Sequence, residues 1–473
     1  MKTNKSTIFT GSINKALISL AIPIVIGQIL QSAYQLTDAF WVGRLGAAQV
    51  AAVSVSMPVT FLVIAIGSGL AMAGATLSAQ YMGAGNQEMV NHVAAQTMLM
   101  VFLTAVVLGL AGYYLSPYFL RLLGVEQDVY HDALQFMHIS FIGVIFVFTY
   151  AIFQAIMRGI GQVKVPLYIV LATVLMNFVL DPLFIFGYGD LPGLGVRGAA
   201  LATLVTQAIA AIVGVTIFMR GKHGIQLNLR SFIPDYVYIK RAFYLGAPGS
   251  VELSARALGL IIMSFLVASF GTVTIASYGV GSNILQFVTI PAMGLSMAVS
   301  TLVGQNIGAK NIERASKIAI LGTIWGFIGL SIIGVIAYFF ASYLVAFFVP
   351  NDPLVIENGA AFVRIMCLTW GFIGVQLCIV SAFRASGNML NTMLLSLISQ
   401  WVIQFPIAYV LSKHSGLGAH GIWWSFAITN IAIAFISIAW FSRGSWKNKR
   451  LTEDDKQIAH VIEESIIEIE DHR

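Results

Sequence analysis

The chain has 473 residues, of which 58% are hydrophobic and 10% are charged, and its formal net charge is +6. Soluble globular proteins carry about 25% charged residues, so this composition excludes a soluble protein and predicts that lipid covers most of the outer surface. The basic residues are spread over short connections between apolar runs and form no block, which argues against a nucleic-acid partner.

Apolar runs separated by charged residues, Gly and Pro predict twelve helices. A helix needs about 20 apolar residues to cross the hydrocarbon of a bilayer, and every run is long enough. The first run continues without a small-residue cleavage site, so we interpret it as a membrane helix and not as a signal peptide. The expected ranges are 14–40, 47–81, 93–119, 133–157, 165–188, 198–219, 242–270, 272–306, 317–349, 358–383, 388–412 and 419–442. We therefore expect an all-α integral membrane fold.

The distribution of Lys and Arg predicts the orientation of these helices. If the N-terminus is cytoplasmic and the connections alternate, the cytoplasmic side holds 20 basic residues and the opposite side four. Because basic connections stay inside, both termini are expected in the cytoplasm of a cell carrying this chain in its plasma membrane.

The longest polar connection divides six helices from six. We expect an N-terminal lobe over 1–219, a cytoplasmic loop over 220–241, a C-terminal lobe over 242–442 and a cytoplasmic tail over 443–473. The tail has mixed charge, with Ile at helical spacing, which predicts a short amphipathic helix.

The two halves resemble one another. Residues 45–88 and 270–313 align without a gap and share 15 identities in 44 positions, including Gln80 with Gln305 and Gly83 with Gly308. Because six helices per half is an even number, both halves enter the membrane from the same side. The repeat therefore predicts two pseudo-symmetric six-helix lobes, with a substrate site between them.

A polar stripe in the first predicted helix contains Gln31, Tyr34 and Asp38, whose spacing places them on one helical face. A charge in hydrocarbon costs at least about 2.5–3.5 kcal/mol, so this face should point into the protein. We interpret Asp38 as a protonatable carboxylate with hydrogen-bonding neighbours. The alternative is an interfacial Asp beside Arg44.

Asp181 lies in a second predicted helix, one turn after Asn177 and directly before Pro182. Because Pro182 lacks a backbone donor, we expect it to interrupt regular helix bonding beside the carboxylate. Two carboxylates in one half indicate a proton mechanism, and the same oxygens with Asn177 are suitable ligands for Na⁺. The alternative for Asp181 is a carboxylate that caps a broken helix.

Glu252 and Arg256 are four residues apart in the seventh predicted helix, and this spacing predicts an ion pair. Either they neutralise each other as a structural pair, or Glu252 contacts a cationic substrate. We find no nucleotide-binding loop, metal-ligand cluster or nucleophile constellation, so neither an enzyme nor a resident cofactor is expected.

At these residues the chain resembles the multidrug and toxic compound extrusion (MATE) family, over essentially its whole length up to about residue 442. The stretches that carry the resemblance, besides their second-half counterparts, are AIPIVIGQILQSAYQLTDAFWVGRLG at 21–46, AQYMGAGN at 79–86, FQAIMRGIGQ at 153–162, NFVLDPLFIFGYG at 177–189 and GLGVRGAALAT at 193–203.

The resemblance implies a twelve-helix, two-lobe exporter of organic cations and other drugs, driven by H⁺ or Na⁺. By similarity to the DinF-type branch, it implies that Asp38 and Asp181 carry the coupling ion. The other residues it implies are Gln31, Tyr34, Asn177 and Thr203 in the first-lobe cavity, and Pro23 as the bend of helix 1. The NorM-type branch has an Asp in helix 10, where this chain has Ile373, so a complete second-lobe Na⁺ site is not expected.

We therefore expect a monomeric multidrug antiporter that works by alternating access, with H⁺ preferred to Na⁺. Its partners would be small organic molecules and the lipid bilayer. One alternative is a flippase for lipid-linked precursors, which needs a more cationic cavity than Arg256 and Arg364 provide. Another is a non-transporting membrane receptor or scaffold, against which the repeat argues.

Overall fold

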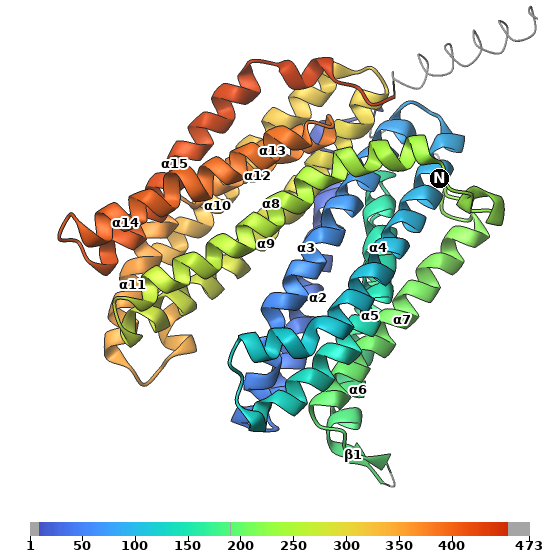
Figure 1. The fold of residues 1–473 in the computed structure, drawn as a ribbon. Coiled ribbons are helices and arrows are strands. Elements are labelled where there is room, and N and C mark those ends of the chain that lie inside the picture. Colours follow the sequence, from blue (N-terminus) through green and yellow to red (C-terminus); the bar gives the residue numbers. More distant parts are fainter. Residues whose placement is uncertain (1–8, 190, 453–473) are drawn as a thin grey trace, which may run out of the picture.

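A computed structural model describes residues 9–189 and 191–452 of the chain, and these residues are almost entirely helical (Figure 1). The long helices of the first half are α2 (Ile13–Gly43), α3 (Ala47–Gly83), α4 (Gln87–Leu122), α5 (Gln127–Gly159), α6 (Lys164–Phe186) and α7 (Val196–Arg220). Those of the second half are α8 (Tyr236–Ala268), α9 (Thr272–Gly308), α10 (Ile312–Phe348), α11 (Pro353–Cys367), α12 (Trp370–Ala385), α13 (Met389–Leu397), α14 (Phe405–Lys413) and α15 (Ala419–Ser442).

Short elements fill the connections. Strands β1 (Gly187–Tyr188) and β2 (Leu191–Pro192) pair antiparallel, with Gly187 opposite Pro192. The 3₁₀ turns are η1 (Leu229–Phe232) and η3 (Ser445–Asn448), and η2 (Ile398–Gln404) is a π-helical stretch that joins α13 to α14. The amphipathic helix predicted in the tail lies outside the described residues.

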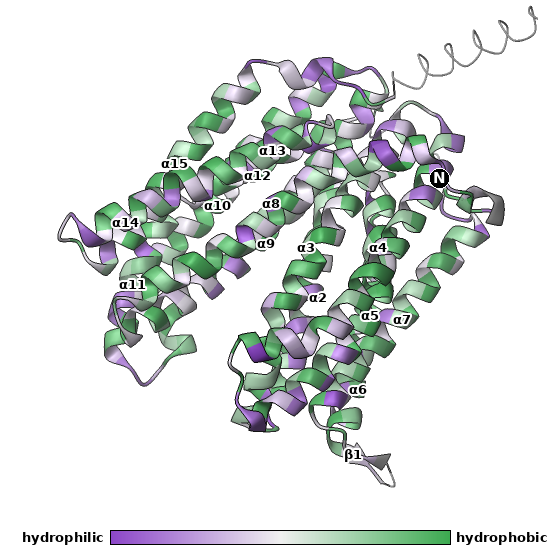
Figure 2. Ribbon diagram, viewed as in Figure 1, coloured by the Kyte–Doolittle hydropathy of each residue, from purple (hydrophilic) through white to green (hydrophobic). Residues whose placement is uncertain are grey.

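The helices have the length and hydropathy of membrane spans. In the described part of the chain 11 helices qualify, and counting α11 and α12 as one bent span gives 12. Figure 2 shows apolar residues along the helices and polar residues gathered near their ends. The prediction of an all-α integral membrane fold with twelve spans is confirmed.

One predicted span is broken. Instead of one helix over 358–383, the chain bends by 52° between α11 and α12. Thr369 stabilises the break, because its amide and its hydroxyl both donate to the Met366 carbonyl, each at 2.9 Å. Asn430 of α15 donates to the same hydroxyl at 3.1 Å. These bonds satisfy backbone groups that would be costly in lipid.

The prolines do not break their helices. The interruption predicted at Pro182 is wrong, since α6 continues through it to Phe186. Pro182 lacks the N–H of one helical hydrogen bond, but it lies only one turn before the end of α6 at Phe186, so little of the helix follows it. Helix α2 is likewise continuous through Pro23, and a bend there during transport stays a prediction.

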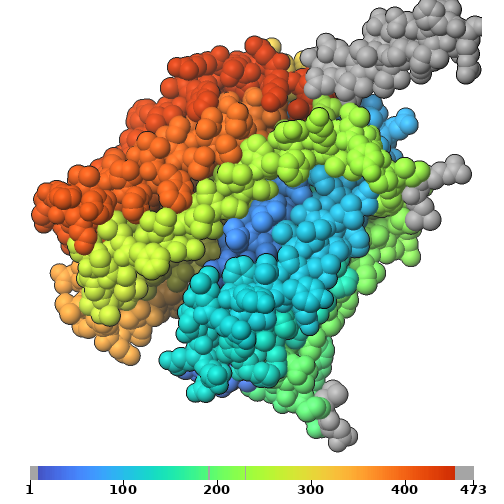
Figure 3. Space-filling model, viewed as in Figure 1, coloured from blue at the N-terminus to red at the C-terminus, as the bar shows by residue number. Residues whose placement is uncertain are grey.

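Figure 1 shows α2–α7 gathered in a first lobe and α8–α15 in a second lobe. We call the end at which α3 joins α4 and α9 joins α10 the inner end; it is the predicted cytoplasmic side. The lobes meet at the inner end and diverge toward the opposite, outer end (Figure 1). The surface is hollowed between α8 and the first lobe (Figure 3). Helix α8 begins at Tyr236, within the loop predicted over 220–241.

Two matching hydrogen bonds join the lobes at the inner end. Gln80 Nε2 of α3 donates to the Ala385 carbonyl at 2.7 Å, and Gln305 Nε2 of α9 donates to the Gly159 carbonyl at 2.7 Å. The amide of Leu451, which follows α15, donates to Gln80 Oε1 at 2.8 Å. The buried Leu451 side chain packs into the hydrophobic core of the first lobe. Residues 443–452, which follow α15 and which we call the strap, therefore link the second lobe to the first at the inner end.

Candidate functional site

The structure brings three helices together around two acidic side chains in the first lobe. Asp38 lies on α2, Asp181 lies on α6, and their carboxyl groups are within hydrogen-bonding reach of each other. Asn177 Nδ2 donates to Asp181 Oδ1 at 3.1 Å, and Thr203 Oγ1 of α7 donates to Asp38 Oδ2 at 3.3 Å. Residues predicted from three separate segments therefore form one polar cluster.

This cluster has more acceptors than donors. Asp38 Oδ1, Asp181 Oδ2 and Asn177 Oδ1 are buried without a hydrogen-bond partner among the described residues. Neither carboxyl forms an ion pair with a basic side chain in that part of the chain. Buried acceptors normally have donors, so three oxygens without one in the same cluster make it a candidate binding site.

A second hydrogen bond extends the cluster along α2. Tyr34, which is buried, shares a 2.6 Å hydrogen bond with Thr206 on α7. Sequence reasoning missed Thr206, although it lies three residues after Thr203 and hence on the same helical face. Gln31 is half-buried, and among the described residues the hydrogen bonds to the two carboxyls come from Asn177 and Thr203 and not from Gln31.

The second-lobe pair is arranged differently from the local prediction. Arg256 lies 3.7 Å from Glu252 Oε1, but Arg384 of α12 is closer, at 2.6 Å from the same oxygen. Ser396 donates to Oε1 at 2.9 Å and Thr392 donates to Oε2 at 3.1 Å. Glu252 is 1% exposed. The charge of Glu252 is therefore balanced by arginine, and its oxygens accept hydrogen bonds from side chains of the protein. This argues against contact with a cationic substrate.

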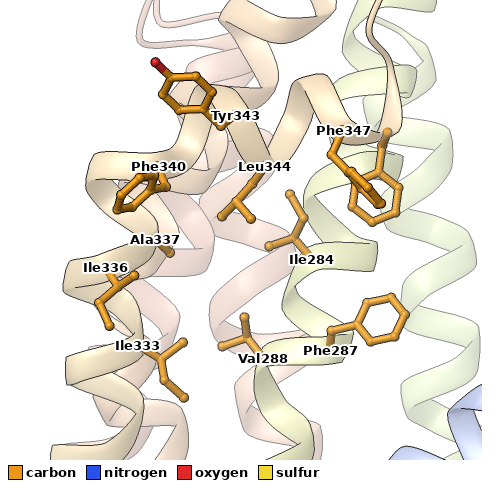
Figure 4. Close-up of a pocket in the computed structure, with 11 residues that line it drawn as sticks. Ile284, Phe287, Val288, Ile333, Ile336, Ala337, Phe340, Tyr343, Leu344 and Phe347 are labelled. Carbon is orange, nitrogen blue, oxygen red and sulfur yellow. The ribbon is translucent and has the colours of Figure 1, made fainter.

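A cavity of about 660 Å³ lies between α9 and α10 (Figure 4), and Asp38, Asp181 and Glu252 are not among the residues that line it. The residues that line it are Ile284, Phe287, Val288, Ile333, Ile336, Ala337, Phe340, Tyr343, Leu344, Phe347 and Phe348. Only Tyr343 among them carries a polar side-chain group. The cavity therefore offers no charged side chain to an ion.

Twelve apolar spans, two similar lobes that diverge at one end, and acids with buried oxygens that lack a donor among the described residues define a multi-pass membrane transporter. The MatE family model matches residues 23–183 and again 248–410, once in each half. The chain therefore belongs to the MatE family, whose members are transporters and not enzymes.

Curated relatives match along nearly the whole chain. The probable multidrug resistance protein YpnP of Bacillus subtilis is 30% identical, over 93% of this chain and 97% of the relative. The probable multidrug resistance protein YoeA of the same organism is 29% identical, over 91% and 94%. A probable multidrug resistance protein NorM of Thermotoga maritima is 27% identical, over 92% and 94%.

Solved structures share the fold. One is described as the outward-facing conformation of a multidrug resistance MATE family transporter; it has a TM-score of 0.88 at 22% identity, covering 94% of this chain and 98% of that one. A crystal structure described as MATE in the straight conformation has a TM-score of 0.87 at 22% identity, covering 94% and 99%. At this identity the likeness supports the fold alone.

Proposed function

We propose that this chain is a proton-coupled antiporter that exports organic, often cationic, compounds across the cell membrane. The relatives named as multidrug resistance proteins support the class of substrate. The outward direction is proposed on the same ground. The observation that carries the coupling is the pair of orphaned oxygens, Asp38 Oδ1 and Asp181 Oδ2.

A single proton resolves the geometry of this pair. When one of two contacting carboxyls is protonated, it becomes a donor to the other, and the repulsion between two charges in a low dielectric is removed. Losing the proton restores two negative charges, which attract a cationic compound. Proton and compound then compete for one site, which is the requirement for exchange.

Sodium is the second candidate for the coupling ion. A proton between the carboxyls leaves Asn177 Oδ1 without a partner, whereas a bound Na⁺ can take all three orphaned oxygens as ligands. This one oxygen is the observation that favours Na⁺.

Alternating access requires that ion and compound stabilise different arrangements of the lobes. Here the lobes are joined at the inner end and diverge at the outer end (Figure 1). Protonation at α2 and α6 reorganises the contacts among α2, α6 and α7, and we infer that α2 then bends at Pro23 and reshapes the first-lobe cavity.

The test is ethidium transport in everted membrane vesicles with an imposed pH gradient, with and without Na⁺. We expect gradient-driven uptake in vesicles that carry the wild type. For Asp38→Asn and Asp181→Asn we expect uptake at the level of vesicles from cells that lack this chain. Asp128→Asn, at an exposed site on α5 of the same lobe, is the matched control and keeps full uptake. Equal uptake by all variants would remove the coupling assignment, and uptake that requires Na⁺ without a pH gradient would replace H⁺ by Na⁺.

A further inference from the structure

Arg256 shares its acidic partner with a second, closer arginine. Arg256 and Arg384 both approach the single oxygen Glu252 Oε1, at 3.7 and 2.6 Å. Glu252 is the one acidic residue in the described helices α3, α8, α9, α12 and α13. Two guanidinium groups therefore share one carboxylate, and the cluster has a net charge of +1.

The shorter contacts assign the carboxylate to Arg384. Arg384, Ser396 and Thr392 all bond to Glu252 at 3.1 Å or less, whereas the Arg256 contact at 3.7 Å exceeds a normal hydrogen bond. Glu252 is satisfied without Arg256. The donors of Arg256 are thus available to another group.

The face of α8 that carries Arg256 points into the second lobe. Glu252, Gly259, Met263 and Val267 lie on the same helical face, and all four are buried. Met263 and Val267 belong to the hydrophobic core of the second lobe. The Arg256 side chain is nevertheless 48% exposed. This exposure leaves the guanidinium accessible to a bound molecule.

Side-chain donors lie on the elements that contact this part of α8. Arg384 Nε and Trp401 Nε1 are buried without a partner in the described part of the chain. Trp401 lies on the π-helical stretch η2, and Gln400, next to it, donates to the Arg256 carbonyl at 3.2 Å. π-Helical turns are frequent at functional sites. A positive charge with spare N–H groups and no free acid fits an anion.

We propose that Arg256 forms an anion subsite in the second lobe, which binds the carboxylate of a transported organic compound. This rests on the proposed function and adds to it the class of substrate. The acidic pair of the first lobe takes the cationic end of a compound, and Arg256 takes an acidic group when there is one. Amphoteric compounds that carry both groups are therefore preferred over simple cations.

Two dyes that differ in one ester test this subsite. Rhodamine 110 has a free carboxyl group, and rhodamine 123 is its methyl ester. Binding to the purified full chain is measured by fluorescence anisotropy. We expect Arg256→Gln to weaken the binding of rhodamine 110 about tenfold, the effect of one charge-assisted contact, and to leave the binding of rhodamine 123 unchanged. Glu252 keeps three other donors in this variant, so its thermal midpoint should match the wild type.

Arg364→Gln is the matched control, because Arg364 lies on α11 of the same lobe and donates to Ser342 at 3.1 Å. Arg364→Gln should leave the binding of both dyes unchanged, and Arg256→Lys should retain part of the preference for rhodamine 110 over rhodamine 123. If Arg256→Gln weakened the binding of rhodamine 110 and rhodamine 123 equally, or weakened neither, the subsite would be overturned. The proposed function fails by a different result, namely the absence of ethidium uptake by the wild type in vesicles.

Discussion

Glu252 and Asp181 are buried and Asp38 is half-buried, but Glu252 and the Asp38–Asp181 pair have opposite surroundings. Glu252 accepts from Arg384, Thr392 and Ser396, and its charge is balanced. Asp38 and Asp181 each keep one oxygen without a donor, and no basic group balances them among the described residues. A carboxylate whose charge is already balanced by an arginine gains little from binding an ion. Two neighbouring carboxyls without a basic partner are stabilised by one. This contrast locates the expected coupling in the first lobe and a structural role in the second.

The structural role of Glu252 predicts a large stability effect. Glu252→Gln leaves the Arg384 guanidinium, which is 23% exposed, without its counter-charge. Breaking a buried ion pair from one side costs about 3–5 kcal/mol. We expect a clear fall in the thermal midpoint of the detergent-solubilised protein. The double variant Glu252→Gln, Arg384→Gln should recover part of the loss, and a single variant as stable as the wild type would contradict the pairing.

The sequence indicated which residues belong to the polar sites more reliably than it indicated their hydrogen-bond and ion-pair partners. Asp38 and Asp181 stand out because charges are rare in apolar runs, and both are in the cluster. The spacing of Glu252 and Arg256 indicated a mutual pair, because local spacing is the only contact that a single sequence displays. Arg384 is 132 positions away from Glu252, and only the packing of α8 against α12 and α13 brings them together.

Among the elements, the crossing of α3 and α9 depends on two glycines at equivalent positions in the repeat. A Cβ atom on Gly83 would collide with the backbone carbonyl of Gln305, and one on Gly308 with that of Gln80. These backbone groups cannot move aside as a side chain can. The shared glycines therefore explain why the repeat is strongest where the lobes meet.

Gly308→Ala is expected to destabilise the protein by about 1–3 kcal/mol, the usual cost of overpacking. Gly279→Ala provides the control on the same helix, since a Cβ there meets nothing within 4 Å. The thermal midpoint of each variant measures the difference. If the two variants had the same thermal midpoint, the close crossing of α3 and α9 would not limit the packing of α9.

Helix ranges were predictable because apolar runs are bounded by charge and glycine, but the break between α11 and α12 was not. Residues 358–383 contain no proline to mark a bend. The break depends on Thr369 bonding to Met366 and on Asn430 reaching it from α15, 61 positions away. Polar residues in an apolar run indicate such a break only once their partners are known.

For the whole molecule, the matching bonds at the inner end hold the lobes in the arrangement of Figure 1. Gln80 reaches the end of α12 and Gln305 reaches the end of α5, so each lobe donates to the other. Any arrangement open at the inner end must break both bonds. At about 1 kcal/mol for each bond, removing both favours opening by ~2 kcal/mol, or about 30-fold in the equilibrium constant.

The double variant Gln80→Ala, Gln305→Ala tests this by distance measurement between spin labels at Glu88 and Glu313, exposed and equivalent positions of the repeat at the inner end. The native cysteines, Cys367 and Cys378, are buried and are replaced by Ala beforehand. We expect a longer-distance population to grow in the double variant and to stay unchanged in Gln35→Ala, an exposed glutamine on α2. Because the strap also bonds to Gln80 through the Leu451 amide, Gln80→Ala alone should open the inner end more than Gln305→Ala alone. Identical distance distributions in all four variants would show that packing of α3 on α9, and not these bonds, keeps the inner end closed.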